Sequence, residues 1–216
     1  MFRLRVIAPV IVMAVFVLSL PAAAQIAASS HDFSGQSWAV NGEICNVCHT
    51  PHDADTSVTG APLWDHDVSA NSGYTLYTSD TLDATLGQPD HHSSRLCLSC
   101  HDGTVAKDAF GSNPNAPADF MTSADDGFIG LDLRGEHPIE FTYDTALATT
   151  DGGLHDPAVA TTELGGTIAN DLLFGGIMGC ASCHDVHNAA PPSGTGGHML
   201  RIDNAGSDFC LTCHDK

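Results

Sequence analysis

All eight cysteines of this chain lie in one motif, Cys-x-x-Cys-His, which occurs four times along its 216 residues. The copies span residues 45–49, 97–101, 180–184 and 210–214. Two thiols at this spacing can add to the two vinyl groups on one porphyrin edge, while the adjacent imidazole turns under the ring and ligates the iron. The motifs therefore predict four covalently attached c-type haems. Their thioether bonds would come from Cys45, Cys48, Cys97, Cys100, Cys180, Cys183, Cys210 and Cys213, and their proximal iron ligands would be His49, His101, His184 and His214.

Zinc knuckles and disulfides are the two other common uses of paired cysteines. A zinc site combines two such pairs and has no need of an adjacent histidine, and a redox disulfide motif usually occurs once, beside a strand–helix pattern. Neither explains the histidine that follows the second cysteine in every copy. Haem attachment is therefore favoured, and it leaves no cysteine for a disulfide.

Nine further histidines are available as distal ligands, on the opposite face of each haem from the motif histidine. His52 and His187 each lie three residues after a motif histidine, so each approaches its own haem from the face already occupied. We expect them to reach the iron of a neighbouring haem instead. The other candidates are His31, His66 and His137, and we expect exposed or supporting positions for His91, His92, His155 and His198. This surplus favours bis-histidine ligation of all four irons.

The four motifs fall into two kinds. The first and third are followed by the second histidine just described, whereas the second and fourth share the pattern Cys-Leu-(Ser/Thr)-Cys-His-Asp without it. The chain therefore reads as two dihaem units, residues 45–102 and 180–215. An insert of residues 103–179 separates them and carries no motif.

The N-terminus has the pattern of a secretory signal peptide. Arg3 and Arg5 precede an apolar run over residues 6–20, and small residues up to Ala24 suggest a cleavage site. The run is shorter than the roughly 20 residues that a spanning helix needs. We expect residues 1–24 to be removed, leaving a mature domain of residues 25–216 without a membrane span. The protein would be exported to the periplasm, the extracellular space or the cell surface.

The mature chain is strongly acidic. Removing Arg3 and Arg5 from the seven basic residues leaves five, against 26 acidic residues. Such a balance disfavours nucleic acid and anionic lipid as partners, and it suits basic protein surfaces or cationic minerals. It also keeps an exported protein soluble, which is an equally good explanation.

Composition predicts a thin protein core. The chain has 21 glycines and 11 prolines but few aromatic residues, and its helical and strand periodicity is weak. We expect the porphyrins to form the interior, with irregular loops and short α-helices wrapped around them and little β-structure. A short helix would follow each motif, and residues 139–143 read as a brief alternating strand.

Five runs, 44–52, 61–64, 96–103, 137–138 and 180–187, resemble the exported multihaem c-type cytochromes with doubled Cys-x-x-Cys-His motifs. The resemblance covers nearly the whole mature chain. It implies a multihaem cytochrome fold with four stacked haems, and His31, His52, His137 and His187 as the leading distal ligands. Some similar tetrahaem proteins polymerise on the cell surface into conductive filaments.

The expected function is therefore electron transfer rather than catalysis. The chain would relay single electrons through haem iron to redox partner proteins or extracellular electron acceptors, with a homopolymer as one form. The alternative is a multihaem reductase in which one iron keeps an open position. Such an enzyme usually places acid–base side chains over the open iron, and the mature chain has few basic residues to offer.

Overall fold

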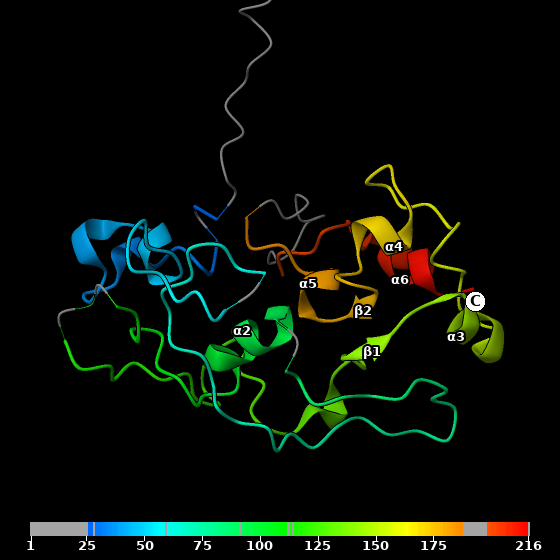
Figure 1. The fold of residues 1–216 in the computed structure, drawn as a ribbon, viewed down its shortest axis with the longest axis horizontal. Helices are drawn as coiled ribbons and strands as arrows, with labels where there is room; N and C mark the ends of the chain where they lie inside the picture. The colour runs from blue at the N-terminus through cyan, green and yellow to red at the C-terminus, as the bar shows by residue number, and fades with distance from the viewer. Residues whose placement is uncertain are drawn as a thin grey trace, which may run out of the picture.

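The structure is a computed structural model that describes residues 26–27, 29–58, 60–90, 92–111, 113, 115–187 and 198–215. The signal peptide predicted at residues 1–24 lies outside this part, as do His91 and the side chain of His92. Loops connect short elements over the whole described chain (Figure 1). The 3₁₀ helices are η1 (Phe33–Gly35), η2 (Val40–Gly42), η3 (Cys45–Val47), η4 (Leu133–Gly135) and η5 (Ala205–Ser207). The α-helices are α2 (His92–His101), α3 (Thr145–Asp151), α4 (Ile168–Asp171), α5 (Cys180–Cys183) and α6 (Asp208–Cys213), and the strands are β1 (Phe141–Thr142) and β2 (Ile177–Met178).

Helical turns coincide with the four motifs. Each motif lies in or at the end of η3, α2, α5 or α6, so the prediction of a helix after each motif was wrong. In the first motif the N–H of His49 donates to the carbonyl of Cys45 at 2.9 Å, which closes one turn, and the third and fourth motifs do the same. Residues three apart lie on one face of a helical turn, so the turn itself brings the two thiols of a motif together.

The predicted strand at residues 139–143 is present in shortened form. Strand β1 pairs antiparallel with β2, with Phe141 opposite Met178. Burial alternates as expected, since Phe141 and Tyr143 are buried and Thr142 is exposed. The strand does not begin earlier because Glu140 has a φ of 61°, which is outside the extended region.

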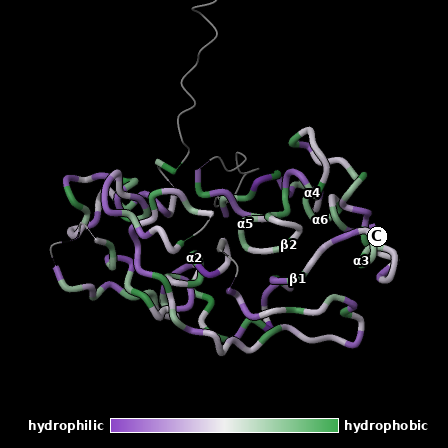
Figure 2. The backbone as a smooth tube through the Cα atoms, viewed as in Figure 1, coloured by the Kyte–Doolittle hydropathy of each residue, from purple (hydrophilic) through white to green (hydrophobic). Residues whose placement is uncertain are grey.

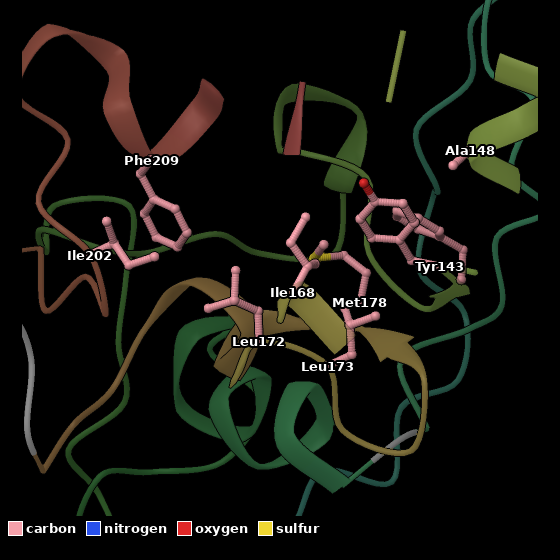
Figure 3. Close-up of a cluster of buried hydrophobic side chains, with 9 residues drawn as sticks. Tyr143, Ala148, Ile168, Leu172, Leu173, Met178, Ile202 and Phe209 are labelled. Atoms are coloured by element: carbon pink, nitrogen blue, oxygen red, sulfur yellow. The ribbon is translucent and has the colours of Figure 1, made fainter. Parts of the chain in front are cut away.

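The larger cluster of buried side chains lies in the C-terminal half of the chain. It joins α4, α6, both strands and the loop before η5 (Figure 3), and its most buried members are Ile168 and Leu172. A smaller cluster contains Tyr74, Leu98 and Leu133. Hydrophobic residues are otherwise scattered along the tube in Figure 2. This distribution agrees with the thin core predicted from composition.

The molecule is elongated, with η1 to η3 at one end and α3 near the C-terminus at the other (Figure 1). Helices α2 and α5 lie against each other near the middle. The Ser94 hydroxyl in α2 accepts a hydrogen bond of 3.1 Å from the N–H of Cys180 at the start of α5. The second and third motifs are therefore neighbours in space, although residues 102–179 separate them along the chain.

No helix within the described ranges is long and apolar enough to cross a bilayer.

The C-terminal cluster gives a direct test of the fold. Ile168 is fully buried, so Ile168→Ala should lower the free energy of unfolding by about 2–5 kcal/mol through lost burial and a residual cavity. Val159 is 70% exposed, so Val159→Ala should change it by less than about 0.5 kcal/mol. Chemical unfolding of the haem-loaded variants, followed by far-UV circular dichroism, measures both. Equal losses in the two variants would contradict this core.

Candidate functional site

A short segment is bonded in the same way to three of the four motifs. In the first motif the N–H of Asp65 donates to the carbonyl of Cys48 at 2.9 Å. The N–H of Thr50 donates to the carbonyl of Leu63 at 2.8 Å. In the third motif, the N–H of Arg201 donates to the carbonyl of Cys183 and the N–H of Asp185 to that of Met199. In the fourth motif, the N–H of His155 donates to the carbonyl of Cys213 and the N–H of Asp215 to that of Gly153. We call residues 62–65, 198–201 and 152–155 the clamp segments, because each fixes the backbone on both sides of a motif histidine.

Two clamp segments contain a strained residue at the same position. Leu63 has a φ of 57° and Met199 a φ of 55°, in the left-handed region that costs a side chain about 1–2 kcal/mol. The fourth motif has Gly153 at this position. Retention of the strained geometry in both segments indicates that the clamp bonds determine the local backbone.

Backbone carbonyls orient three of the motif histidines. A carbonyl can only accept a hydrogen bond, so a ring nitrogen bonded to one must carry the proton. The Nδ1 atoms of His49, His101 and His184 lie 2.8, 2.7 and 2.6 Å from the carbonyl oxygens of Pro62, Gly127 and His198. Each Nε2 therefore keeps its lone pair, which is the tautomer that ligates a metal.

The second motif is held differently. Its histidine ends α2, and its carbonyl accepts bonds from the N–H groups of Ile129 and Gly130 at 2.8 and 3.1 Å. Gly127, with a φ of 82°, supplies the carbonyl that orients the His101 ring. By their backbone contacts, the first, third and fourth motifs form one group. The sequence instead groups only the first with the third, because a second histidine follows each of these two motifs.

Three imidazole pairs bring a motif histidine against a candidate distal histidine. The separations between ring centroids are 6.0 Å for His31–His101, 6.1 Å for His49–His187 and 6.3 Å for His137–His214. With metal–nitrogen bonds of about 2.0 Å and about 1.15 Å from each nitrogen to its ring centre, two imidazoles on opposite sides of one iron lie roughly 6.3 Å apart. All three pairs have the spacing of axial ligands that share an iron.

His31 is the member of these pairs whose surroundings change its protonation. Its Nδ1 lies 3.0 Å from the sulfur of Met199, a weak acceptor. Burial, together with the neighbouring His101 and His184 rings, lowers the pKa of His31 to about 4. The ring is therefore neutral at physiological pH, as an iron ligand must be.

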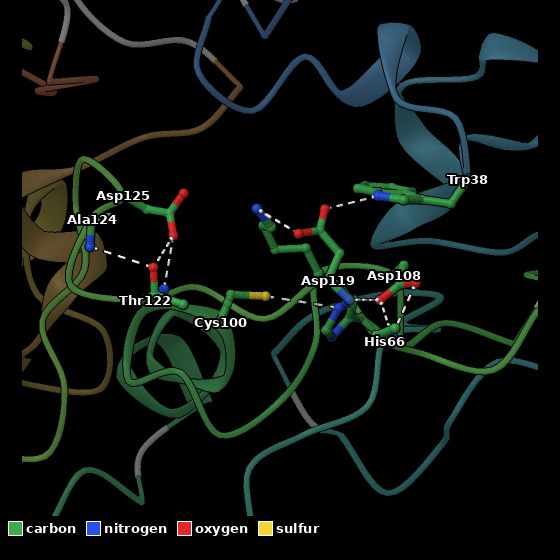
Figure 4. A network of polar contacts seen from close by, with 10 residues as sticks. Trp38, His66, Cys100, Asp108, Asp119, Thr122, Ala124 and Asp125 are labelled. Carbon is green, nitrogen blue, oxygen red and sulfur yellow. Dashed lines mark hydrogen bonds and ion pairs between the residues drawn. The ribbon is translucent and has the colours of Figure 1, made fainter.

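The two remaining candidates, His52 and His66, do not pair with a motif histidine in the described part of the chain. His52 is exposed. His66 is buried, with Nδ1 2.7 Å from the carbonyl of Asp67 and Nε2 3.8 Å from the sulfur of Cys100 (Figure 4). Among the described side chains, His184 likewise has no second imidazole against it at the spacing of the three pairs.

Cysteines of different motifs also approach one another. Where α2 meets α5, the Cys180 side chain lies close enough to Cys97 to raise the pKa of the Cys97 thiol. The attachment points of the second and third motifs are therefore adjacent.

The site residues fit covalent haem. Burial raises the pKa of the Cys48 and Cys183 thiols to about 11 and that of Cys100 and Cys213 to about 12. Zinc binds thiolates, so thiols that burial keeps protonated are poor zinc ligands. The described residues also contain no group of three or more metal-ligating side chains around one point. Thiol pairs on single turns and opposed imidazoles match a porphyrin better than a zinc knuckle.

The clamp segments were missed in the sequence. Those of the first and third motifs follow their motif closely, and the similar runs Pro62-Leu63-Trp64 and His198-Met199-Leu200 were the available signal. The clamp of the fourth motif, residues 152–155, precedes it by more than fifty residues. Local pattern carries no information about a contact of that range.

A family model described as the doubled CXXCH motif matches residues 176–216. The matched segment contains the third and fourth motifs with their turns α5 and α6. No curated protein matches the chain. The family match supports covalently bound haem c and an electron-transfer role of the cytochrome type.

Gly127 offers a test of how the second motif is held. Gly127→Ala puts a side chain on a left-handed backbone, with its methyl group 3.4 Å from the His101 ring, and relief of the backbone strain should displace the carbonyl that bonds His101. A weaker Nδ1–H bond makes imidazole a poorer electron donor, so one haem should gain a more positive reduction potential. Gly165→Ala is the matched control, because Gly165 also has positive φ but nothing lies within 4 Å of the added methyl. Spectroelectrochemical titration distinguishes them, and identical curves for both variants would contradict the role of Gly127.

Proposed function

We propose that this chain is a tetrahaem c-type cytochrome that relays single electrons in the periplasm or at the cell surface. The observation that carries the proposal is the set of three imidazole pairs, each with the centroid spacing of two ligands on one iron. Each pair joins a motif histidine to a histidine from a distant part of the chain. Bound haem supplies reversible one-electron chemistry.

The protein residues would each have a defined role. The two thiols of every motif form the thioether bonds, and the motif histidine is the proximal ligand. His187, His31 and His137 are the distal ligands opposite His49, His101 and His214, respectively. Two imidazoles leave no open position on an iron and favour low reduction potentials. Ligation of this kind suits electron transfer better than catalysis.

The ligand pairs interlock the two dihaem units. His187 comes from the turn after the third motif, yet its ring faces His49 of the first. This placement supports the proposal that His187 ligates the haem of the first motif rather than its own. Residues 45–102 and 180–215 are therefore proposed as parts of one domain, because neither unit supplies all of its own axial ligands.

Export and partner choice extend the same proposal. The predicted signal peptide delivers the chain to the compartment where c-type haem is attached, and 26 acidic residues favour basic surfaces on redox partner proteins or cationic extracellular acceptors. The proximity of Cys97 and Cys180 supports a relay in which the haems of the second and third motifs are neighbours.

A polymer is the second form that a specific observation favours. His52 is exposed, and within the described region His184 faces no imidazole at the ligand spacing. His52 of one subunit would complete the iron of the third motif in the next subunit. The alternative, a reductase, would keep that same iron open for a small substrate.

The ligand assignment is tested by opening one iron at a time. The purified protein should carry four haems per chain by mass. Each of His31→Ala, His137→Ala and His187→Ala should add about one equivalent of carbon monoxide binding per reduced chain, because one distal ligand is lost. His66→Gln is the control, since the His66 ring faces no motif histidine among the described residues and its loss should add none. Unchanged binding in all three alanine variants would contradict the assignment.

Subunit ligation is tested by microscopy and concentration dependence. Wild-type protein at high concentration should form filaments in negative stain, and His52→Ala should give discrete particles with one iron open to carbon monoxide. Discrete wild-type particles at every concentration would argue against the polymer. If one iron of the wild type also binds carbon monoxide at every concentration, the reductase becomes the better description.

A further inference from the structure

We infer that the hydrogen bond between Trp38 and Asp119 positions His31 for the iron of the second motif. The inference rests on the proposed function in one respect, namely that His31 is a distal ligand. It concerns residues 29–42, which we call the N-terminal arm, and the loop of residues 105–119 against which the arm packs.

The arm must carry His31 across to a motif that begins more than sixty residues later in the chain. Its own structure is two short 3₁₀ helices, η1 and η2, and the Asp32 side chain caps η1 by accepting from the N–H of Ser34 at 3.1 Å. Helices this short are not stable alone, so the arm depends on contacts with the body of the protein.

Aromatic rings connect the ligand to the anchor point. His31 lies edge-on to Phe33 with 6.0 Å between centroids, and Phe33 lies 5.5 Å from Trp38. Trp38 then meets Phe110 of the opposing loop at 6.1 Å. The position of Trp38 is therefore transmitted through Phe33 to the ligand ring.

One directional bond fixes this row of rings. The indole N–H of Trp38 donates to Asp119 at 2.9 Å (Figure 4). Bonds to a charged acceptor are stronger and more directional than contacts between ring edges. The arm has two weaker polar contacts with the body, from the Asn46 amide to the Val40 carbonyl at 3.4 Å and between His31 and the Met199 sulfur at 3.0 Å. The indole–carboxylate bond is the charge-assisted one, so it contributes most to the register of the arm.

Asp119 is itself held in place by contacts within its own loop. Lys107 forms an ion pair with its carboxylate at 3.1 Å and donates its backbone N–H to the Asp119 carbonyl at 2.8 Å. The buried carboxylate of Asp108 accepts from the N–H groups of Ala118 and Asp119, each at 2.9 Å. The loop thus presents a fixed acceptor, and Trp38 and Asp119 act as positioning residues for His31.

The decisive variants remove the bond and keep the rings. Trp38→Phe deletes the donor, and Asp119→Ala deletes the acceptor. Either change should open a fraction of one iron in four, seen as a high-spin ferric signal and as carbon monoxide binding of up to about one equivalent per chain. Added imidazole should abolish both signals, because it replaces a displaced ligand but does not refold a damaged protein. Asp125→Ala is the charge-matched control, since the Asp125 carboxylate hydrogen-bonds only within its own turn to Thr122 in the described structure and its loss should leave all irons low-spin (Figure 4).

His31→Ala separates failure of this inference from failure of the proposed function. If His31→Ala opens one iron while Trp38→Phe and Asp119→Ala stay fully low-spin, the positioning role is overturned and the ligand assignment stands. If His31→Ala opens none, His31 is not a ligand and both fall. If Asp119→Ala does not accumulate, Asp119→Asn is measured in its place. This variant keeps an oxygen acceptor without the charge, so it should show a smaller fraction of open iron than Trp38→Phe. A fully low-spin Trp38→Phe variant overturns the inference in either case.

Discussion

A haem iron takes four ligands from its porphyrin, so the polypeptide must deliver the fifth and sixth from opposite faces of a flat ring. A single turn can supply the two thiols and one imidazole, but the second imidazole must come from elsewhere. The proposed ligation would explain why residues 31, 137 and 187 lie against motifs far from them in sequence, with ring separations of 6.0, 6.3 and 6.1 Å.

The rest of the architecture serves that requirement. Clamp segments fix the backbone on both sides of three motif histidines, and carbonyl oxygens hold Nδ1 protonated so that Nε2 is left to bind the metal. The larger cluster of buried side chains surrounds Ile168 and Leu172, and a smaller one contains Tyr74, Leu98 and Leu133. A thin protein core is the expected condition of a chain whose interior would be largely haem.

How much could be predicted depended on the range of each contact. The thioether and proximal residues were predicted from local spacing alone. The position of His187, three residues after a motif histidine, led to the expectation that it reaches a neighbouring haem, and its ring lies 6.1 Å from that of His49. The same argument predicts that His52 reaches a neighbouring haem. In the described structure the His52 side chain is exposed and pairs with no motif histidine, because the local sequence does not specify the direction of this turn. The clamp of the fourth motif and the Trp38–Asp119 anchor lay beyond local pattern altogether.

The central claim is that imidazoles from distant segments share an iron. A crystal structure of the haem-loaded protein tests it most directly at the first motif, where the two ligands come from opposite units of the chain. We expect Nε2 of His49 and Nε2 of His187 on opposite sides of one iron, each at about 2.0 Å. An iron at this motif that is bound by water, or by a residue other than His187, would contradict the account.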